Sequence, residues 1–396
     1  MNMRNVSLTP SRYTKGGLKS RKYRGILPSP AEDCLIEVSA DGTTVDLNGS
    51  VLDGENSVRV GIYVHDCNGV TIKQGTVKGF YYGIRAVNVS RLTIENCVVS
   101  DNHNPRDAGW LPDADEPVEE GFGGGIYLLR VSDSRIEGNR LNNNFNGVSL
   151  VRSERNRITR NNASYSGNIG IHLLESSHNT IEENAADHCI RYTDRFWCDT
   201  ADSAGILLEE YSHHNNVVGN SLRYSGDGFF IRANNRHGCN HNYVARNDGS
   251  FSPNNAFEAG FSQHNVFEDN TADFSNYGFW LGYSSNTVVR GNQIRSNRLD
   301  GIAIECGHQN CIEENQISGN RAGIRLWCSG SPSKKEEVGS TESGDKISKN
   351  RISGSRECGV LVSENQDVLL EENIYQDNQH DYLRKPEAEL GPGSST

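Results

Sequence analysis

The sequence predicts an all-β solenoid, and two columns of recurring residues are the observations that predict it. Asparagines recur at intervals that are mostly 22 or 23 residues, and a glycine column with the same period opens a short apolar-polar-apolar strand each time. Self-similarity at this period indicates units that stack into one continuous core. The asparagines are Asn139, Asn161, Asn184, Asn220, Asn247, Asn270, Asn292, Asn315, Asn350 and Asn373. The glycine column is Gly61, Gly83, Gly125, Gly147, Gly170, Gly205, Gly228, Ala256, Gly278, Gly301, Gly323 and Gly359.

Each repeat is too short for helices. It has the form Gly-Ile-x-Leu-x, a turn, x-Ile-x-x-Asn and a second turn, which predicts two or three short parallel strands per coil. We expect the solenoid to cover residues 34–376 as a single domain of roughly 12 to 13 coils, counted from the glycine column. Residues 1–33 are expected to form an arm or cap over the first coil, and residues 377–396 a flexible polar tail.

Four insertions interrupt the period. Three of them precede Gly125, Gly205 and Ala256, and therefore enter the turn before the strand that each of these residues opens. The fourth, Ser329 to Ser343, follows its strand. Because insertions in repeat proteins gather on the binding face, the outer surface of these strands, here named the Gly-strands, is the expected site.

The composition excludes several classes of function. A charge of −12 argues against a nucleic-acid partner, and no stretch approaches the roughly 20 apolar residues of a membrane span. The first 17 residues lack a signal-peptide core. We therefore expect an extracytoplasmic location if a signal peptide has been removed and a cytoplasmic one otherwise; the oligomeric state is not predicted.

The repeat pattern resembles the right-handed parallel β-helix proteins of the pectate-lyase-like superfamily over about residues 34–376. This resemblance implies a right-handed β-helix and a carbohydrate-active or copper-accessory-like protein, since the superfamily includes lyases, hydrolases, epimerases and non-enzymatic members. The Asp-Pro-His-Asp motif of mannuronan C5-epimerases is absent, as are the Asn-Thr-Asp and Asp-Asp motifs of polygalacturonases. The resemblance therefore transfers no catalytic residue.

Candidate catalytic residues emerge when each Gly-strand is numbered from its glycine as position 0. Positions 1 and 3 then point inward and positions 2 and 4 outward. Glu209, Arg232 and Glu258 fall outward on successive coils, with Asp227 at the turn just before Phe229 and His172 as a further proton-transfer candidate. The carboxylates of Glu209 and Glu258 should lie about 8–11 Å apart. That range overlaps the separation in inverting glycosidases, although a plain salt-bridge ladder gives the same pattern.

The same outward columns carry aromatic rings, which suit stacking against sugars. Gly260 and Gly282 at position 4 beside Trp280 predict an open trough for an extended glycan. The expected substrate-binding residues are Phe230, Trp280, Trp327, Glu305, Tyr127 and Arg325.

These residues favour an enzyme that cleaves glycosidic bonds by two-carboxylate acid/base chemistry. One alternative is a uronate lyase or C5-epimerase in which Arg232 neutralises the substrate carboxylate and His172 acts as base, which a net charge of −12 does not favour. Another is a non-enzymatic glycan- or metal-binding accessory protein. No cofactor is expected, although a bound divalent cation such as calcium remains open, and Met1 and Met3 as the only methionines exclude a Met-rich copper site.

Histidine and cysteine columns leave alternatives open. Histidines directly precede the Asn repeat on several coils, where they could serve either as metal ligands or as turn residues: His178, His214, His241 and His264. Cys306 and Cys328 at position 5 of adjacent strands suit either a disulfide or a row of reduced thiols. Cys189 and Cys198 bracket the second insertion and could staple it.

Overall fold

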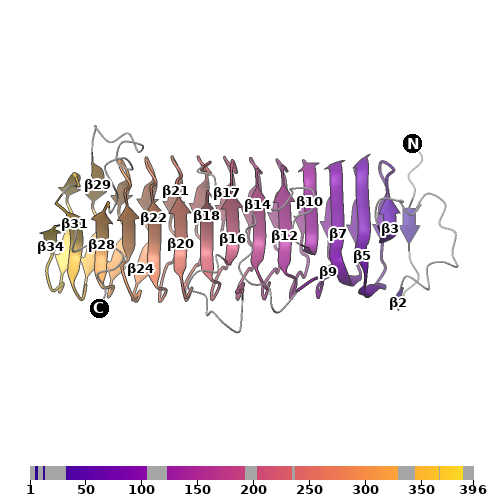
Figure 1. Ribbon diagram of the computed structural model, residues 1–396, viewed down its shortest axis with the longest axis horizontal. Helices are drawn as coiled ribbons and strands as arrows, with labels where there is room; N and C mark the ends of the chain where they lie inside the picture. The colour runs from indigo at the N-terminus through magenta and orange to yellow at the C-terminus, as the bar shows by residue number, and fades with distance from the viewer. Residues whose placement is uncertain are drawn as a thin grey trace. The chain divides into compact units, whose positions relative to one another are not determined.

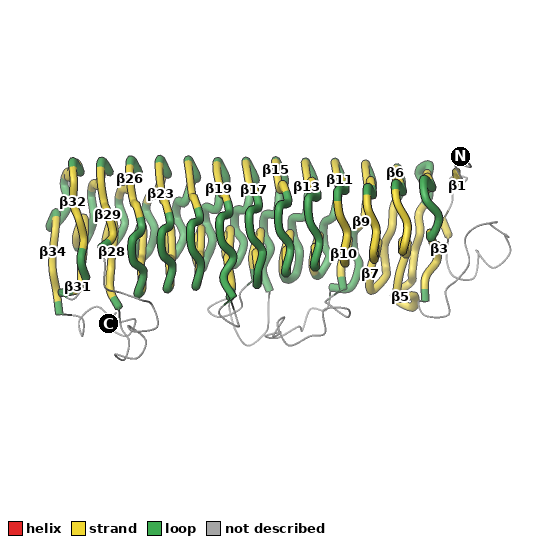
Figure 2. The backbone as a smooth tube through the Cα atoms, turned by 90° about the horizontal axis from the view of Figure 1, so that it is seen from above, coloured by secondary structure: helices red, strands yellow, loops and turns green. Residues whose placement is uncertain are grey.

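The computed structural model describes residues 5–7, 12–13, 33–104, 123–191, 203–233, 237–328, 344–364 and 366–386. The chain folds as a right-handed parallel β-solenoid of about 13 turns, which confirms the predicted fold class. Strands and connecting turns account for the described ranges, which contain no helix that could span a membrane (Figure 2). The chain divides into two compact units, Met1–Leu207 and Leu208–Thr396.

The first unit contains two rows of parallel strands, and within each row a strand pairs with the corresponding strand of the next coil (Figure 1). The row that precedes the asparagines has the order β1 (Asn5–Ser7), β4 (Thr44–Asp46), β6 (Thr71–Lys73), β8 (Thr93–Glu95), β11 (Arg135–Glu137), β13 (Arg157–Thr159) and β15 (Thr180–Glu182). The Gly-strand row has the order β2 (Arg12–Tyr13), β5 (Val51–Asn68), β7 (Thr76–Ser90), β10 (Gly124–Ser132), β12 (Asn146–Val151) and β14 (Ile169–Leu174). β3 (Cys34–Val38) pairs with β5, and β9 (Val98–Val99) pairs with β7.

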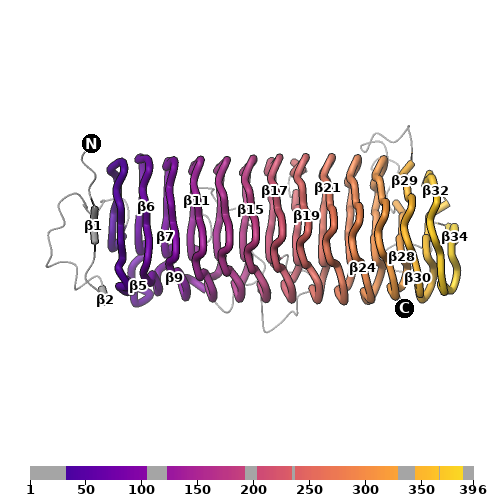
Figure 3. The backbone as a smooth tube through the Cα atoms, turned by 180° about the vertical axis from the view of Figure 1, so that it is seen from behind, coloured from indigo at the N-terminus to yellow at the C-terminus, as the bar shows by residue number. Residues whose placement is uncertain are grey.

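The second unit repeats this plan and adds a third row of four strands, β24, β27, β30 and β33 (Figure 3). The asparagine row is β17 (Asn216–Val218), β19 (Tyr243–Ala245), β21 (Val266–Glu268), β23 (Val288–Arg290), β26 (Cys311–Glu313), β29 (Asp345–Ser348) and β32 (Val368–Glu371). The Gly-strand row is β18 (Asp227–Arg232), β20 (Asn255–Gly260), β22 (Tyr277–Gly282), β25 (Ile302–Glu305), β28 (Ala322–Trp327), β31 (Cys358–Ser363) and β34 (Tyr382–Lys385), while β16 (Ala204–Glu209) spans the boundary between the units. The third row is β24 (Gln293–Arg295), β27 (Gln316–Ser318), β30 (Arg351–Ser353) and β33 (Ile374–Gln376).

Alternation of side chains along the strands builds the core. Phe229, Phe257 and Phe279 occupy position 1 of successive Gly-strands and are fully buried. Phe267 of β21, on the asparagine row, meets all three edge-on, with ring centroids 5.8–6.3 Å apart. Position 1 therefore points into the space between the rows, as predicted.

The asparagine column is a continuous ladder of buried side-chain amides. Asn292, for example, donates through Nδ2 to the carbonyl oxygen of Phe267 at 3.0 Å and to Oδ1 of Asn315 at 3.0 Å. Its own Oδ1 accepts from the backbone N–H of Asn270 at 2.8 Å. These bonds satisfy turn backbone groups that the strands leave unpaired, so the asparagines are scaffold.

The glycine column reflects close approach between coils. A Cβ atom added to Gly301 would lie 2.6 Å from the carbonyl oxygen of Gly323, and one on Gly278 would lie 2.5 Å from that of Gly301. Only glycine avoids such contacts without displacing the next coil.

The ends of the fold differ in part from the expected boundaries. In the N-terminal arm, β1 pairs with β4 and β2 pairs with β5, so the arm adds strands to both rows. The β-helix continues past residue 376, because β34 pairs with β31, and residues 387–396 lie outside the described residues. The predicted insertions fall mostly on ranges that the structure does not describe: 105–122, 192–202, 234–236 and 329–343.

Candidate functional site

The outward columns of the second unit keep the register that the repeat predicts. At position 2, Phe230 pairs with Glu258, and Glu258 pairs with Trp280. At position 4, Gly260 pairs with Gly282, Gly282 with Glu305, and Glu305 with Trp327. The sequence period therefore placed these candidate residues in the correct rows.

The expectation that the outward rings are exposed is wrong for three of the four. Trp327 is 1% exposed, Phe230 5% and Tyr127 3%. Trp327 packs into an outward-facing apolar cluster with Ala303, Ala322, Cys358 and Leu361, and Tyr127 belongs to a similar cluster in the first unit. Neighbouring rungs fill the space beside each ring, so these residues act as packing in the described structure.

Two of the predicted catalytic groups form a buried ion pair. Arg232 donates through Nε to Oε1 of Glu209 at 3.1 Å, and its Nη2 atom lies 3.1 Å from the same oxygen. Glu209 is fully buried and the Arg232 side chain is 7% exposed. The positive charge of Arg232 is therefore offset within the protein.

A second hydrogen-bonded group links Asp227 to Glu258 through residues that sequence reasoning missed. Asp227 is buried, and its Oδ1 accepts from Asn254 Nδ2 at 2.8 Å and from the Asn255 backbone N–H at 2.9 Å. Asn255 in turn donates through Nδ2 to Oε2 of Glu258, while its buried Oδ1 atom has no hydrogen-bond partner among the described residues. Asn255 lies one residue before Ala256, so position −1 of the repeat was the available signal.

Position −1 also supplies Asp300, a fully buried acid that the sequence analysis did not select. Its carboxylate accepts from Arg321 at 2.8 and 3.0 Å and lies 3.5 Å from Nη1 of Arg325. The Arg325 guanidinium carbon stands 4.5 Å from the ring centroid of Trp327. Arg325, predicted to contact substrate, is instead 6% exposed and held between an acid and a ring.

Trp280 and the two glycines form the open part of this surface. Trp280 is half-buried and meets Trp327 and Tyr277 edge-on, with centroids 5.4 and 4.9 Å away. Its Nε1 atom would lie 3.2 Å from a Cβ on Gly282, so the indole covers that glycine. Among the described residues, the only atom within 4 Å of a Cβ on Gly260 would be the Ile231 carbonyl oxygen, at 3.7 Å. The predicted trough is therefore filled by Trp280 at Gly282, and at Gly260 it stays a prediction.

His172 belongs to the first unit, whereas Glu209, Asp227 and Glu258 belong to the second. It is 6% exposed and pairs in register with Ser149, which pairs with Tyr127. The next residue of that row, Arg85, lies against the rings of Tyr63, Tyr82 and Tyr127 at 5.2–6.0 Å.

The histidine column of the second unit is an exposed ring stack. His214, His241 and His264 lie parallel, with centroids 5.0 and 4.8 Å apart. Burial, together with the neighbouring His264 and His214, lowers the pKa of His241. Nowhere in the described ranges do three or more His, Cys, Asp or Glu side chains gather in a way that could hold a metal ion.

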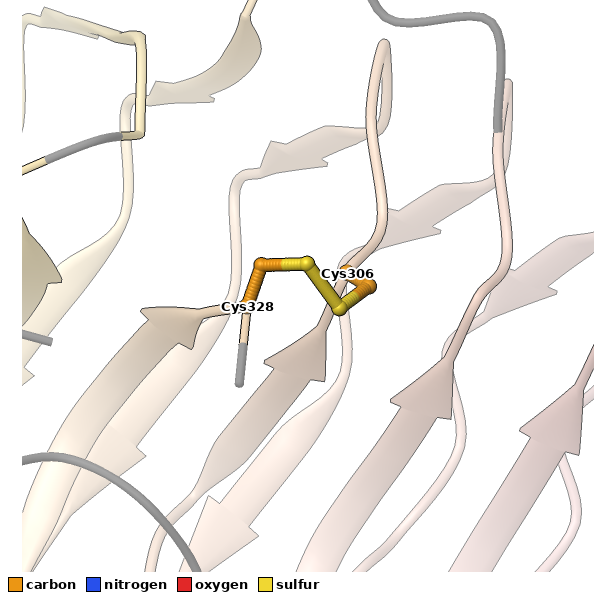
Figure 4. Close-up of a disulfide and its surroundings, with 2 residues drawn as sticks. All are labelled: Cys306 and Cys328. Atoms are coloured by element: carbon orange, nitrogen blue, oxygen red, sulfur yellow. A yellow bond between two sulfur atoms is a disulfide. The ribbon is translucent and has the colours of Figure 1, made fainter. Parts of the chain in front are cut away.

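The cysteine alternatives are settled for the described residues. Cys306 and Cys328 form a disulfide between β25 and β28, which confirms the first of the two predicted alternatives (Figure 4). Cys189 is a buried thiol that donates to the carbonyl oxygen of Ala186 at 3.4 Å. The staple considered for the second insertion would join it to Cys198, which lies outside the described residues.

Two family models match the chain. The model described as "Right handed beta helix region" matches residues 36–222, and the one described as "Periplasmic copper-binding protein (NosD)" matches residues 187–386. No curated protein matches the chain.

Several solved structures are similar to this chain. The A-module of mannuronan C-5 epimerase AlgE4 from Azotobacter vinelandii is 13% identical over 88% of this chain and 89% of its own, with a TM-score of 0.49. The periplasmic alginate epimerase AlgG is 11% identical over 94% and 85%, with a TM-score of 0.45. The Dettilon tailspike protein is 14% identical over 87% and 60%, with a TM-score of 0.45. At such identities the activities of those proteins do not carry over to this chain.

Proposed function

The chain belongs to the family described as periplasmic copper-binding protein (NosD), and we propose that it is a carbohydrate-active enzyme within that family of right-handed β-helix proteins. The proposed reaction is cleavage of a glycosidic bond on the outer face of β20, β22 and β25. One observation carries the proposal. Glu258 and Glu305 are half-buried carboxylates on either side of Trp280, next to the open backbone at Gly260.

The spacing of these two acids suits an inverting mechanism. Two strand spacings and an offset of two residues put their Cα atoms about 12 Å apart. Side chains that lean toward each other over Trp280 would bring the carboxyl groups into the range of about 6.5–9.5 Å that seats a water between acid and base. Retaining enzymes need a shorter separation of about 5–5.5 Å, which this placement does not favour.

We assign the general base to Glu258, because the Asn255 amide donates a hydrogen bond that orients its carboxylate. Glu305, on the far side of Trp280 and paired in register with Gly282 and Trp327, is assigned the general acid. Glu209 and Asp227, predicted as catalytic, are bound to Arg232 and to Asn254 and Asn255, so we give them a positioning role.

The lyase and epimerase alternative receives less support. It requires Arg232 to neutralise a substrate carboxylate, but Arg232 is committed to Glu209, which is fully buried.

Copper, which the family description names, does not fit the described residues. In the described part of the chain, no group of three or more His, Cys, Asp or Glu side chains is arranged to hold a metal ion. The exposed, parallel rings of His214, His241 and His264 do not form such a group. No step of the proposed reaction involves a metal.

We further propose an extracytoplasmic location. The disulfide between Cys306 and Cys328 is of a kind that persists in oxidising compartments and is rare in the cytosol. The family description, which names a periplasmic protein, agrees with this proposal.

Incubation of the full chain with a panel of polysaccharides, followed by assays for new reducing ends and for absorbance near 235 nm, tests the function. Hydrolysis gives reducing ends without unsaturated sugars. Glu258→Gln and Glu305→Gln should each lower turnover by at least about 100-fold, the effect typical of losing an acid or base. Glu313→Gln, on the asparagine row, is the matched control and should retain wild-type turnover. Unsaturated products would instead establish a lyase, and full activity of Glu258→Gln would refute the assigned base.

A further inference from the structure

We propose that His65 is a pH-sensitive clamp, which holds β3 against β5 in acidic medium and weakens that attachment in alkaline medium. The clamp lies in the first unit, whereas the proposed glycan site lies in the second. It uses Glu37 and Asp66, two carboxylates to which nothing above assigns a role.

Both ring nitrogens of His65 face a carboxylate. Nε2 lies 2.9 Å from Oε1 of Glu37 on β3, and Nδ1 lies 3.0 Å from Oδ2 of Asp66, the next residue on β5. An ionised carboxylate only accepts hydrogen bonds, and a neutral imidazole carries one N–H. Both contacts are therefore hydrogen bonds when His65 is an imidazolium, and the geometry selects that form.

The contact with Glu37 joins two strands and is largely shielded from water. The side chain of Glu37 is 9% exposed and that of His65 is 22% exposed, whereas that of Asp66 is 65% exposed. Asp66 also accepts from Asn88 of β7 at 2.8 Å, and Asn88 accepts from Arg130 of β10 at 2.6 Å. The charge of His65 therefore matters more to Glu37 than to Asp66, because water screens the exposed carboxylate.

The other groups around the ring favour a positive charge or are neutral. The Tyr63 ring is stacked on the imidazole within 21°, with centroids 4.7 Å apart, and the face of an aromatic ring attracts a cation. On its other neighbour, β7, the guanidinium carbon of Arg85 lies 6.0 Å from the Tyr63 ring centroid. The residue of β7 in register with His65 is Val87, which is uncharged. The two carboxylates are therefore the charges that act on the ring.

These contacts hold the ring in its protonated form. Burial lowers the pKa of His65, but the hydrogen bonds to Asp66 and Glu37 and the charges of both carboxylates outweigh it, so the pKa lies above its ordinary value of 6.5. For a pKa that is raised in the folded state, the stabilisation is complete below the ordinary value and is lost as the pH rises through the folded-state pKa. The clamp is therefore closed in acidic medium and open in alkaline medium.

β3 is the strand that this change can release. It pairs with β5 and has no other strand partner in the described part of the chain, whereas β5 also pairs with β7 and β2. A strand held along one edge opens locally at a lower free energy than a strand held along both. Above its pKa, His65 keeps one N–H for two carboxylates, so the attachment of β3 weakens.

NMR titration of the histidine ring signals in the full chain tests the protonation, with each signal assigned through its own backbone. The midpoint of His65 should lie above 6.5, whereas that of His241, whose pKa burial and two neighbouring histidines lower, should lie below 6.5. Glu37→Gln and Asp66→Asn should each lower the midpoint of His65. Asp133→Asn, which removes an exposed carboxylate of another ion pair in the first unit, is the matched control and should leave that midpoint unchanged.

Hydrogen exchange tests the release of β3. The amides to follow are those that join β3 and its preceding residue to β5, such as the Val60 N–H, which donates to the carbonyl oxygen of Asp33 at 2.9 Å. Divided by the intrinsic rate at each pH, their exchange rates should rise about threefold as the pH passes the midpoint of His65, the effect of losing a partly exposed ion pair. Amides between β10 and β12 should show no such rise. In His65→Gln, the corrected rates should equal those of the alkaline wild type at every pH.

Three results would overturn the clamp. They are a His65 midpoint at or below 6.5, a midpoint that stays unchanged in both Glu37→Gln and Asp66→Asn, and corrected exchange between β3 and β5 that does not vary with pH in the wild type. If His65→Gln does not fold, the wild-type titration and the wild-type exchange still decide between the outcomes.

Discussion

Arg232 and Glu209 form a buried ion pair on the outward side of their strands, with 3.1 Å from Nε to Oε1. Outward positions of a solenoid usually meet water, where such a pair would contribute little. Here the Glu209 side chain is 0% exposed and that of Arg232 is 7% exposed. Both charges are therefore shielded from water and compensate each other within the protein.

Replacing one partner of this pair should be costly. Arg232→Met leaves the Glu209 carboxylate buried without its partner, and we expect it to lower the free energy of unfolding by about 3–5 kcal/mol. Chemical denaturation measures the loss. Arg290→Gln is the control, because the Arg290 side chain is 41% exposed in its pair with Glu268 and its loss should cost at most about 1 kcal/mol. Equal losses of unfolding free energy in the two variants would contradict the expected difference between the buried and the exposed ion pair.

The fold and the rows of the candidate site could be predicted from the sequence because the repeat is itself the geometry. A residue at a fixed offset from its glycine has one neighbour on each adjacent coil, so the period alone paired Glu258 with Trp280 and Gly282 with Glu305.

Burial within those rows could not be predicted in the same way. It depends on contacts that do not repeat, such as that of Arg325 with Trp327 and Asp300. The partners of Asp227 and Glu258 also fell outside the columns considered. Asn255 and Asp300 lie at position −1, while the sequence analysis weighed positions 2 and 4 for catalysis.

The asparagine ladder should carry much of the stability of the second unit. Asn292→Ala removes four hydrogen bonds: two to Asn270, one to Asn315 and one to the Phe267 carbonyl. At about 0.5–1.5 kcal/mol each, we expect a loss of about 2–6 kcal/mol in denaturant unfolding. Asp269→Asn, at the exposed corner of the preceding coil with φ 54°, should be neutral. A loss in Asn292→Ala no larger than in that control would show that the ladder is not a main source of stability.

Asp345 should make stability depend on pH. It continues the column of Asn310, accepts a hydrogen bond from the Asn310 backbone N–H at 2.9 Å, and its buried Oδ2 atom has no hydrogen-bond partner among the described residues. Burial raises the pKa of Asp345 from its ordinary value of 3.8 to about 6. The protonated form is therefore favoured in the folded state. Its stabilisation is complete below about pH 4 and is lost as the pH rises through 6.

Asp345→Asn should remove this dependence, because the amide resembles the protonated acid and repeats the residue type of the ladder. Melting temperatures of the two proteins should agree near pH 4, and the variant should be more stable at pH 8 by up to about 3 kcal/mol. Parallel melting curves from pH 4 to 8 would refute a titration at this residue.

The disulfide between Cys306 and Cys328 should stabilise the second unit. It closes a loop with a sequence separation of 22, for which the loss of entropy in the unfolded chain corresponds to about 3 kcal/mol. Dithiothreitol should therefore lower the melting temperature of the wild type. The same reagent should have no effect on the Cys306→Ser/Cys328→Ser double variant, which should melt like the reduced protein. Identical melting of the wild type with and without reductant would argue against the stabilisation.

Gly260 offers a direct test of the open surface, because a side chain can be added there without a clash. Among the described residues, a Cβ would meet only the Ile231 carbonyl oxygen at 3.7 Å, and Gly260 does not adopt a left-handed φ angle. Gly260→Leu should therefore leave the melting temperature unchanged within about 2 °C, the effect of less than about 0.5 kcal/mol. It would nevertheless place four carbons beside Glu258, where the glycan is proposed to cross β20. We expect glycan turnover to fall at least about tenfold. Gly260→Ala, which adds a single carbon, should lie between Gly260→Leu and the wild type. Unchanged turnover in Gly260→Leu would mean that substrate does not cross β20 at this point.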